Sequence, residues 1–581
     1  MLKYIPIILI ALSLALLIRC LRSMLRERID PEIWAYIRAG RDLVPVCHWE
    51  NIIGRALSAD IRVFGSGIGR THAILRRNDR GVWTVHDVFA KGGVWVNGEK
   101  VPEYGAEVCH GDIINLGGAC ITFLDINDEQ RRINEENRNR SGRLVSPLIT
   151  LLELSLFQAF LLLQHTFTAE KQYLVPIALS FGGVVALEWI LYAFMRLMKR
   201  AGFEIEILAF YLTTLGLSVA ASSVPENIYR QLALITASVL LFLLGGWWLR
   251  NLRRTTAMRI PVAVMALGLL ALNAAVGYTI GGAQNWLSFW GYSFQPSEFV
   301  KVCYIYVGAA MLHTLYKRKN LYSFIIFSAV CVVVLALLGD FGTALVFFVT
   351  FLVISFMRSG SLATVLLAVS GAGLAGFLAV TYKPYIGRRF EIWGHVWEDV
   401  YDKGYQQSRA ISAAASGGLI GKGAGAGWFK NIVAADTDLV FSVVAEEQGL
   451  IIASLMVLAV ILMVFFAIRT ARNCRSAYHG IASCATMAML LTQLALNVFG
   501  TLDMLPFTGV TFPFVSRGGS SLLSCWMLMA FLKAADNRRG ASFAVRAPKS
   551  VGIAEEYEES GAEPEDYDDY GDYPGEAEGG A

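Results

Sequence analysis

The second half of the chain is mostly apolar, and its longest moderately polar break lies at 383–449. It opens with KPYIGRRFEIW (383–393), contains the glycine-rich run SGGLIGKGAGAG (416–427) and ends with ADTDLVFSVVAEEQG (435–449). A long apolar segment precedes this stretch and another follows it. Polar backbone between membrane spans is tolerated where protein surrounds it or where it lines a cavity. We therefore predict an ordered loop over residues 383–440 at one face of a bilayer, and we expect it to carry the chemistry of the protein.

The composition of the whole chain agrees with a membrane setting. Hydrophobic residues make up 55% of the 581 residues, charged residues only 17%, and the mean hydropathy is +0.50. A soluble protein of this length cannot bury so much apolar surface, so the composition predicts an α-helical polytopic membrane protein. We expect thirteen spans: an uncleaved N-terminal anchor within 1–20, and segments near 147–167, 173–195, 203–221, 230–249, 260–281, 297–316, 321–338, 340–357, 361–381, 441–466, 478–499 and 518–533.

Short clusters of arginine and lysine lie beside these segments, and all except the pair Arg388 and Arg389 fall on one side of the predicted membrane. Basic residues favour the cytoplasmic side. The pattern therefore predicts a multi-pass membrane protein with its N-terminus outside, its C-terminus in the cytoplasm and the 383–440 loop outside. Clusters of this kind indicate orientation, so they argue against a nucleic-acid partner.

Residues 30–128 differ in character from the rest of the chain. Short alternating runs such as VWTVHDV (82–88) are bounded by Gly, Asn and Asp. This pattern is typical of strands in a small all-β sandwich, which the topology places in the cytoplasm. A charged linker follows at 129–146, and the acidic segment 540–581 is expected to be a disordered cytoplasmic tail.

Four motifs in this β region resemble the forkhead-associated (FHA) family of phosphothreonine-binding domains: IIGR (52–55), GRTHAIL (69–75), GGVWVNG (92–98) and HGDIINLG (110–117). The resemblance implies that Arg55, Arg70 and His72 are phosphopeptide-binding residues. Gly69 and Gly92 stand where the family has a serine and an asparagine that grip the peptide. Two interpretations follow: phosphopeptide recognition, or a degenerate scaffold or docking domain.

Three further motifs join the polar loop as candidates for chemistry. NWLSFWGYSFQPSEFVK (285–301) leads into a span and puts Glu298 and Lys301 on one helical face. LGDFGT (338–343) is a tight turn whose aspartate either caps the next helix or has a functional role. MLPFTGVTFPFVSRGGSS (504–521) breaks an apolar stretch, so its polar side chains are expected to face a cavity.

Together and in this order, the four segments resemble the SEDS family (FtsW, RodA, SpoVE). The matching motifs are QPSE-x-x-K at 295–301, D-x-G-T at 340–343, R-R at 388–389, G-Y-Q at 404–406, S-G-G-x-x-G-K-G at 416–423, T-D-x-x-F-x-x-x-x-E-E-x-G at 437–449 and L-P-x-T-G-x-x-x-P-F-x-S-x-G-G-S-S at 505–521. Gly339 replaces a proline that is usual in the family. The resemblance covers a ten-span core over 203–535, so the anchor, the β domain and the two spans at 147–195 are additions.

The resemblance implies a peptidoglycan glycosyltransferase that polymerises lipid II in division, elongation or sporulation, together with a class B penicillin-binding protein. Asp438 matches the family's essential loop aspartate and is expected to be the base. Lys301 would keep Asp438 ionised or steady the leaving phosphates, and Glu298 would orient Lys301 or help to hold a divalent cation such as Mg²⁺. Arg388 and Arg389 would clamp the pyrophosphate.

The remaining substrate-binding candidates are polar residues expected at the cavity: Gln406, Glu446, Glu447, Ser516 and Arg517. No dedicated metal cage is visible in the sequence, so no cofactor beyond Mg²⁺ is expected. Two alternatives stay open. One is a lipid II flippase, which would also need an intramembrane cavity, and the other is a non-catalytic cell-division scaffold.

Overall fold

The computed structural model describes a helical bundle and a β domain. The described residues are 4–26, 32–56, 59–78, 81–88, 91–140, 146–198, 200, 202–280, 282–289, 292–313, 318–359, 362–382 and 391–536. The predicted fold class, a polytopic helical protein with a small β sandwich, is confirmed. The tail predicted over 540–581 lies outside the described residues.

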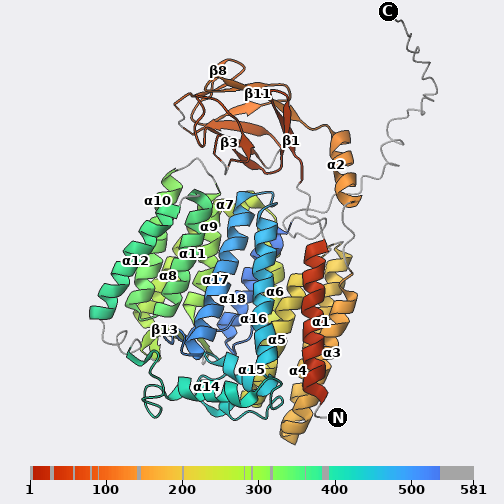
Figure 1. Cartoon of the computed structure of the whole chain (residues 1–581), viewed down its shortest axis with the longest axis vertical. Coiled ribbons are helices and arrows are strands. Elements are labelled where there is room, and N and C mark those ends of the chain that lie inside the picture. The colour runs from red at the N-terminus through yellow and green to blue at the C-terminus, as the bar shows by residue number, and fades with distance from the viewer. Residues whose placement is uncertain are drawn as a thin grey trace, which may run out of the picture. The chain divides into compact units, whose positions relative to one another are not determined.

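The helices account for most of the chain (Figure 1). Within the described ranges, nine are long and apolar enough to cross a membrane, and two shorter apolar helices accompany them. The chain is therefore a multi-pass membrane protein. The helices are α1 (Ile5–Arg26), α2 (Asp128–Arg140), α3 (Leu148–Thr168), α4 (Lys171–Leu197), α5 (Glu204–Ser223), α6 (Ile228–Leu249), α7 (Leu252–Ala257), α8 (Arg259–Val276), α9 (Pro296–Leu312), α10 (Arg318–Leu337), α11 (Phe341–Ser359), α12 (Leu362–Tyr382), α14 (Tyr405–Gly417), α15 (Val440–Gln448), α16 (Leu450–Ala471), α17 (Ala477–Thr501) and α18 (Gly519–Ala535), with 3₁₀ turns η2 (Pro225–Asn227) and η3 (Phe429–Asn431).

Helix α5 lies at the centre of one half of the bundle, because its apolar span is buried on every side. The N-terminal helix α1 packs beside α3 and α16. Two polar contacts fix it there: Arg19 Nε lies 2.7 Å from Glu153 Oε1 on α3, and Ser23 Oγ donates to Glu204 Oε1 on α5 at 2.6 Å. The added helices α1 and α3 are therefore joined to the body of the bundle by polar contacts as well as by apolar packing.

The single span predicted over 441–466 is wrong. The helix breaks at Gly449, so that the short α15 ends at Gln448 and the long α16 begins at Leu450. Gly449 has φ +88°, and a Cβ there would lie 2.4 Å from the carbonyl oxygen of Leu419. Only glycine tolerates this conformation and this close approach. The break separates α15, which carries Glu446 and Glu447, from the span that follows.

A small sheet connects α8 to α9 where the sequence predicted only a loop and the end of a span. Its strands are β12 (Tyr278–Ile280), β13 (Ala283–Phe289) and β14 (Tyr292–Phe294), paired antiparallel in the order β12-β13-β14. The predicted span 260–281 therefore ends as a helix at Val276. Sheet, α14 and α15 lie at the same end of the bundle, and α1 begins at that end (Figure 1).

The β domain is a sandwich of two sheets, with strand orders β2-β1-β11-β10-β7-β8 and β4-β3-β5-β6-β9. Inward side chains of both sheets, including the fully packed Trp83 and Phe123, form one apolar core. The strands are β1 (Ala35–Ala39), β2 (Asp42–Val46), β3 (Glu50–Gly54), β4 (Ile61–Arg62), β5 (Ala73–Arg77), β6 (Trp83–Asp87), β7 (Val94–Val96), β8 (Glu99–Lys100), β9 (Ala106–Val108), β10 (Ile113–Leu116) and β11 (Ala119–Asp125). The alternation seen in the sequence is the inside–outside alternation of these strands.

Candidate active site

The segment before α15 lies against the broken stretch before α18. Arg517 pairs through its guanidinium with the Asp436 carboxylate, and its backbone N–H donates to the Asp436 carbonyl oxygen at 2.8 Å. The Ser516 hydroxyl donates to the carbonyl oxygen of Thr437. The two segments are thus held together at several points, although they are about 80 residues apart in sequence.

Asp438 is half-buried at this junction. Asn497 on α17 donates through Nδ2 to the carbonyl oxygens of both Asp438 and Val510, each at 2.8 Å. A Cβ on Gly509 would lie 3.3 Å from Asp438 Oδ2, and Gly509 has φ +69°. The carboxylate therefore lies against bare backbone, where it combines a fixed position with partial exposure, as a general base requires.

Glu298 and Lys301 form a buried ion pair in the first turns of α9. Lys301 Nζ lies 2.8 Å from Glu298 Oε1, and the two side chains are 1% and 3% exposed. Ser524 on α18 donates to the other carboxylate oxygen, Oε2, at 2.7 Å. Both oxygens of Glu298 are thus engaged by protein, which suits a residue that orients Lys301.

Asp340 caps α11, as one of the two predictions for this turn proposed. Its Oδ1 accepts the backbone N–H of Thr343 at 3.1 Å. Its Oδ2 also accepts weak bonds from Asn285 Nδ2 at 3.4 Å and Gln295 Nε2 at 3.3 Å. The cap therefore also ties β13 and the start of α9 to the turn. Gly339 precedes it with φ +81°, which explains a glycine at this position.

Glu446 is fully buried and organises the glycine-rich loop. Its Oε1 lies 2.7 Å from Lys422 Nζ and accepts the Trp428 N–H at 3.2 Å, and its Oε2 accepts the Phe429 N–H at 3.0 Å. A buried carboxylate with three donors is well satisfied. The geometry thus gives Glu446 a loop-positioning role beside its predicted place in substrate binding.

Glu447 faces the other side of α15, toward α5. Ser222 Oγ donates to its Oε2 at 2.8 Å. Burial raises the pKa of Glu447 to about 7, although a bond from the Gly425 backbone, the Ser222 hydroxyl and the charge of Lys430 act in the opposite direction. Glu447 is therefore a carboxyl group that changes protonation near neutral pH.

The remaining predicted residues are placed as follows. Gln406 is half-buried on α14, and its Nε2 donates to the Val433 carbonyl oxygen at 3.2 Å. Arg388 and Arg389 lie outside the described residues.

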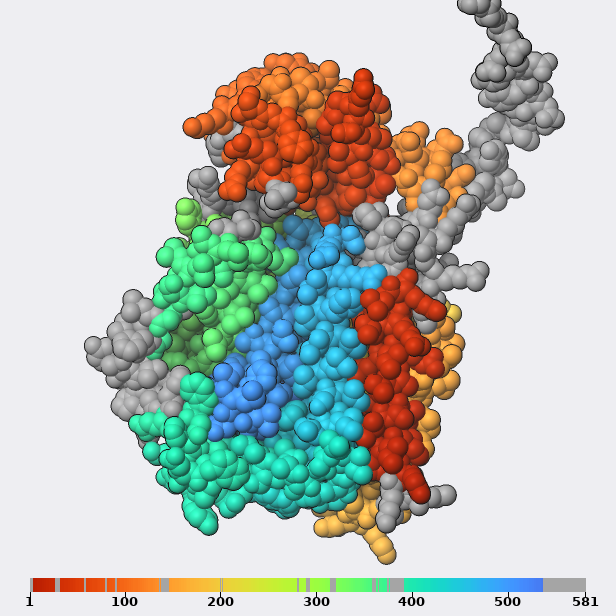
Figure 2. Space-filling model, viewed as in Figure 1, coloured from red at the N-terminus to blue at the C-terminus, as the bar shows by residue number. Residues whose placement is uncertain are grey.

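Residues 391–440, largely teal, cover this end of the bundle as a continuous layer (Figure 2). Within the part of the chain that the structure describes, no group of three or more His, Cys, Asp or Glu side chains is arranged to hold a metal ion.

Several residues of the site were missed at the sequence level. Asp436 lies in the stretch 435–449 but was not among the predicted site residues, yet it pairs with Arg517. Lys422 lies inside the glycine-rich run, and it was not among the predicted site residues. Ser524 and Asn497 occupy apolar helices, and only their tertiary neighbours reveal what they bind.

In the β domain, Arg55 and Arg70 have exposed side chains. His72 is fully buried: its Nδ1 accepts the Gly69 N–H at 3.0 Å, and its Nε2 lies 2.9 Å from the carbonyl oxygen of Gly93. His72 therefore joins two loops. Of the three predicted residues, only the two arginines therefore have exposed side chains.

The two glycines at the family's serine and asparagine positions differ in the space around them. A Cβ on Gly92 would lie 2.6 Å from the Cα of Gly117 and 3.2 Å from His72 Cε1, so no side chain fits there without a shift of backbone. A Cβ on Gly69 would meet nothing closer than 3.3 Å. The backbone of Gly117 and the ring of His72 therefore occupy the space that an asparagine at position 92 would need.

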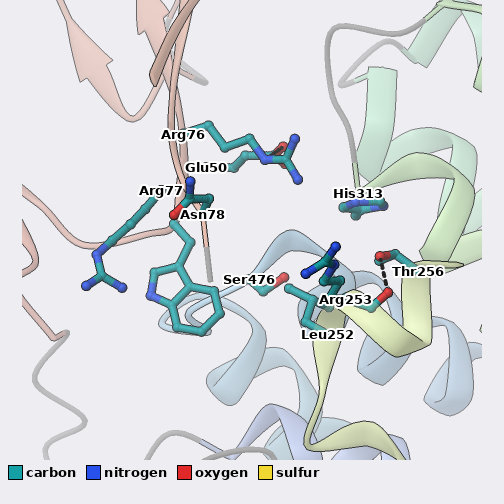
Figure 3. A pocket seen from close by; sticks show the side chains of 10 residues that line it. Glu50, Arg76, Arg77, Asn78, Leu252, Arg253, Thr256, His313 and Ser476 are labelled. Atoms are coloured by element: carbon teal, nitrogen blue, oxygen red, sulfur yellow. Dashed lines mark hydrogen bonds and ion pairs between the residues drawn. The ribbon is translucent and has the colours of Figure 1, made fainter. Parts of the chain in front are cut away.

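A second cluster of polar residues lies where the β domain contacts the helices. His48 Nδ1 lies 2.8 Å from the Cys474 carbonyl oxygen, and the Trp49 N–H donates to the Arg475 carbonyl oxygen at 2.8 Å. Beside these contacts is a cavity of about 130 Å³, in which Arg76 extends toward His313 with Glu50 beside it (Figure 3). Glu50 lies 3.6 Å from Arg76 and offsets its charge.

The arrangement agrees with a family match over the helical part. The family model for FtsW, RodA and SpoVE, described as cell cycle protein, matches residues 222–540, more than half of the chain. The chain belongs to the FtsW/RodA/SpoVE family. The FHA domain model matches residues 51–117. Helices α1, α3 and α4 of this family member lie before the matched helical region.

Two curated relatives agree with this assignment. The chain is 31% identical over 289 residues to stage V sporulation protein E of Bacillus subtilis, covering 48% of this chain and 77% of that protein. It is 31% identical over 350 residues to a probable peptidoglycan glycosyltransferase FtsW of Tolumonas auensis, covering 57% and 91%. A solved chain from a peptidoglycan synthase complex is 27% identical, with a TM-score of 0.49, covering 57% of this chain and 97% of that chain.

Proposed function

We propose that this protein is a peptidoglycan glycosyltransferase that polymerises lipid II into glycan strands at the outer face of the bacterial cytoplasmic membrane. The observation that carries the proposal is the meeting of Asp438 with the 504–521 stretch at the end of the bundle covered by α14 and α15. The ion pair Glu298–Lys301 is joined to α18 next to that stretch through Ser524. A carboxylate that can act as a base and a buried cation at one end of a bundle suit the transfer of a glycosyl group onto a hydroxyl group.

The reaction forms one bond and breaks one. A sugar hydroxyl of one lipid II molecule attacks the anomeric carbon of the growing chain, and the bond from that carbon to the pyrophosphate oxygen breaks. Asp438 takes the hydroxyl proton, and undecaprenyl pyrophosphate leaves with the electron pair. Negative charge grows on the leaving phosphates, so nearby cations lower the barrier.

The residues divide these tasks. Lys301, held by Glu298, supplies a fixed ammonium group. Arg388 and Arg389 supply the cations that bind the pyrophosphate. Arg517 is already paired with Asp436, so its proposed contact with substrate needs that pair to open or to share its guanidinium. Glu446 acts through the glycine-rich loop that it holds.

The site needs a defined orientation in the membrane. We place the end with α14, α15 and the start of α1 outside, so that the β domain and the C-terminus are cytoplasmic. The short basic clusters support this choice. A class B penicillin-binding protein would crosslink the glycan strands, and the β domain would dock other division or elongation proteins on the cytoplasmic side.

An experiment with vesicles separates the enzyme from the alternatives. Purified protein is reconstituted with fluorescent lipid II, with and without class B penicillin-binding proteins. We expect glycan strands that a muramidase degrades. Movement of lipid II across the bilayer without polymer would favour a flippase. Neither activity, under conditions where a known family polymerase works, would contradict the proposal and favour the scaffold.

A further inference from the structure

The added helix α3 reaches the glycine-rich loop with its last turn. Gln164 and Thr168 lie one helical turn apart there. Gln164 Oε1 accepts the backbone N–H of Ala424 at 3.2 Å, and Thr168 Oγ1 donates to the Ala424 carbonyl oxygen at 2.6 Å. Both backbone groups of one loop residue are therefore bound by side chains of α3. Helix α3 precedes the region that matches the family model.

Ala424 needs these partners. It is fully buried, and a buried N–H or C=O without a partner is costly. The preceding amides are bound on the opposite side: the Lys422 N–H donates to the Glu446 carbonyl oxygen at 3.0 Å and the Gly423 N–H to that of Glu447 at 2.8 Å. The loop thus lies between α15 and α3, and α3 provides one wall.

Close packing continues at the next residue. Gly425 has φ +73°, and a Cβ there would lie 2.7 Å from Thr168 Oγ1. One turn earlier on α3, His165 Nε2 lies 2.9 Å from Ser218 Oγ on α5. One turn further along α5, Ser222 donates to Glu447. Helix α3 is therefore anchored to the same face of α5 that holds the carboxyl group of α15.

We propose that α3 is a positioning element for the glycine-rich loop, with Gln164 and Thr168 as its positioning residues. Holding Ala424 fixes the segment whose neighbours, Lys422 and Phe429, bind the Glu446 carboxylate. The loop in turn holds the end of α15, the helix that follows the acidic segment with Asp436 and Asp438. The effect on turnover rests on the proposed glycosyltransferase function, whereas the effect on the loop does not.

The test compares Thr168→Val, and Gln164→Leu with Thr168→Val, against wild type. Thr166→Val is the matched control, because the Thr166 hydroxyl is exposed and binds only Leu163 O of its own helix. Thr168→Ser keeps the hydroxyl and should behave as wild type. Hydrogen exchange of the amides at 421–425 and lipid II polymerisation are both measured in reconstituted full-length protein.

We expect faster exchange at 421–425 in the two α3 variants, a fall in kcat of about ten-fold or more and a KM for lipid II within about two-fold. Thr166→Val and Thr168→Ser should match wild type in both assays. Unchanged exchange would overturn the inference. Faster exchange with unchanged kcat would show that the loop position does not set turnover. If wild type makes no polymer, the proposed function fails separately, and the exchange data still decide whether α3 holds the loop.

Discussion

Replacement of Glu447 by glutamine should change how stability depends on pH. The carboxyl group is buried, and burial raises its pKa from the ordinary value of 4.5 to about 7. A group with a higher pKa in the folded state binds its proton more tightly there, so its contribution is greatest at low pH and is lost as the pH rises. One pKa unit is worth about 1.36 kcal/mol, so the full loss is about 3 kcal/mol, most of it between pH 5 and pH 8.

Glutamine has the same shape, stays neutral and can still accept the Ser222 hydrogen bond. We therefore expect Glu447→Gln to gain about 2 to 3 kcal/mol relative to wild type between pH 5 and pH 8. The assay is the thermal unfolding midpoint in detergent at both pH values. Glu398→Gln, at an exposed position on the same end, is the control and should follow wild type. Equal pH dependence in wild type and Glu447→Gln would contradict a raised pKa for Glu447.

Three other changes test separate parts of the structure. Gly449→Ala should destabilise the protein by about 3 kcal/mol, because it combines a strained φ with a clash against the Leu419 carbonyl; a midpoint equal to wild type would contradict the break between α15 and α16. Arg517→Gln should cost about 2 kcal/mol, because it leaves the Asp436 carboxylate without its ion pair, and Asp436→Asn in the same background should recover part of the loss. Phosphothreonine peptides should bind the β domain weakly, and Arg55→Ala should abolish that binding in isothermal titration; submicromolar binding that survives the substitution would contradict the assignment.

The large features of the fold follow from apolar length and strand alternation, both of which are local. The break at Gly449 does not, because the hydropathy on its two sides is continuous and the close contact with residue 419 is tertiary. The sheet at 278–294 is short, and its residues are apolar enough to resemble the end of a span. Local patterns therefore place the helices but do not show where an apolar stretch leaves the bundle.

The site shows the same division. Motif order indicates Asp438, Glu298 and Lys301, and the spacing of the last two predicts their ion pair. It does not indicate that Arg517 is already engaged by Asp436, or that Glu446 binds the glycine-rich loop. Such pairings depend on which segments meet after folding. The proposed role of α3 is of the same kind, because only the folded structure brings Gln164 and Thr168 to Ala424.

Asp438 is proposed to act as the base in the polymerisation of lipid II. The most direct measurement is single-turnover polymerisation of lipid II by reconstituted wild type and Asp438→Asn, with the exposed Asp402→Asn as control. Folding and lipid II binding of each variant are checked first. We expect strands from wild type and Asp402→Asn, and a rate at least about a hundred-fold lower for Asp438→Asn with unchanged lipid II binding. Equal rates for Asp438→Asn and wild type would contradict the account.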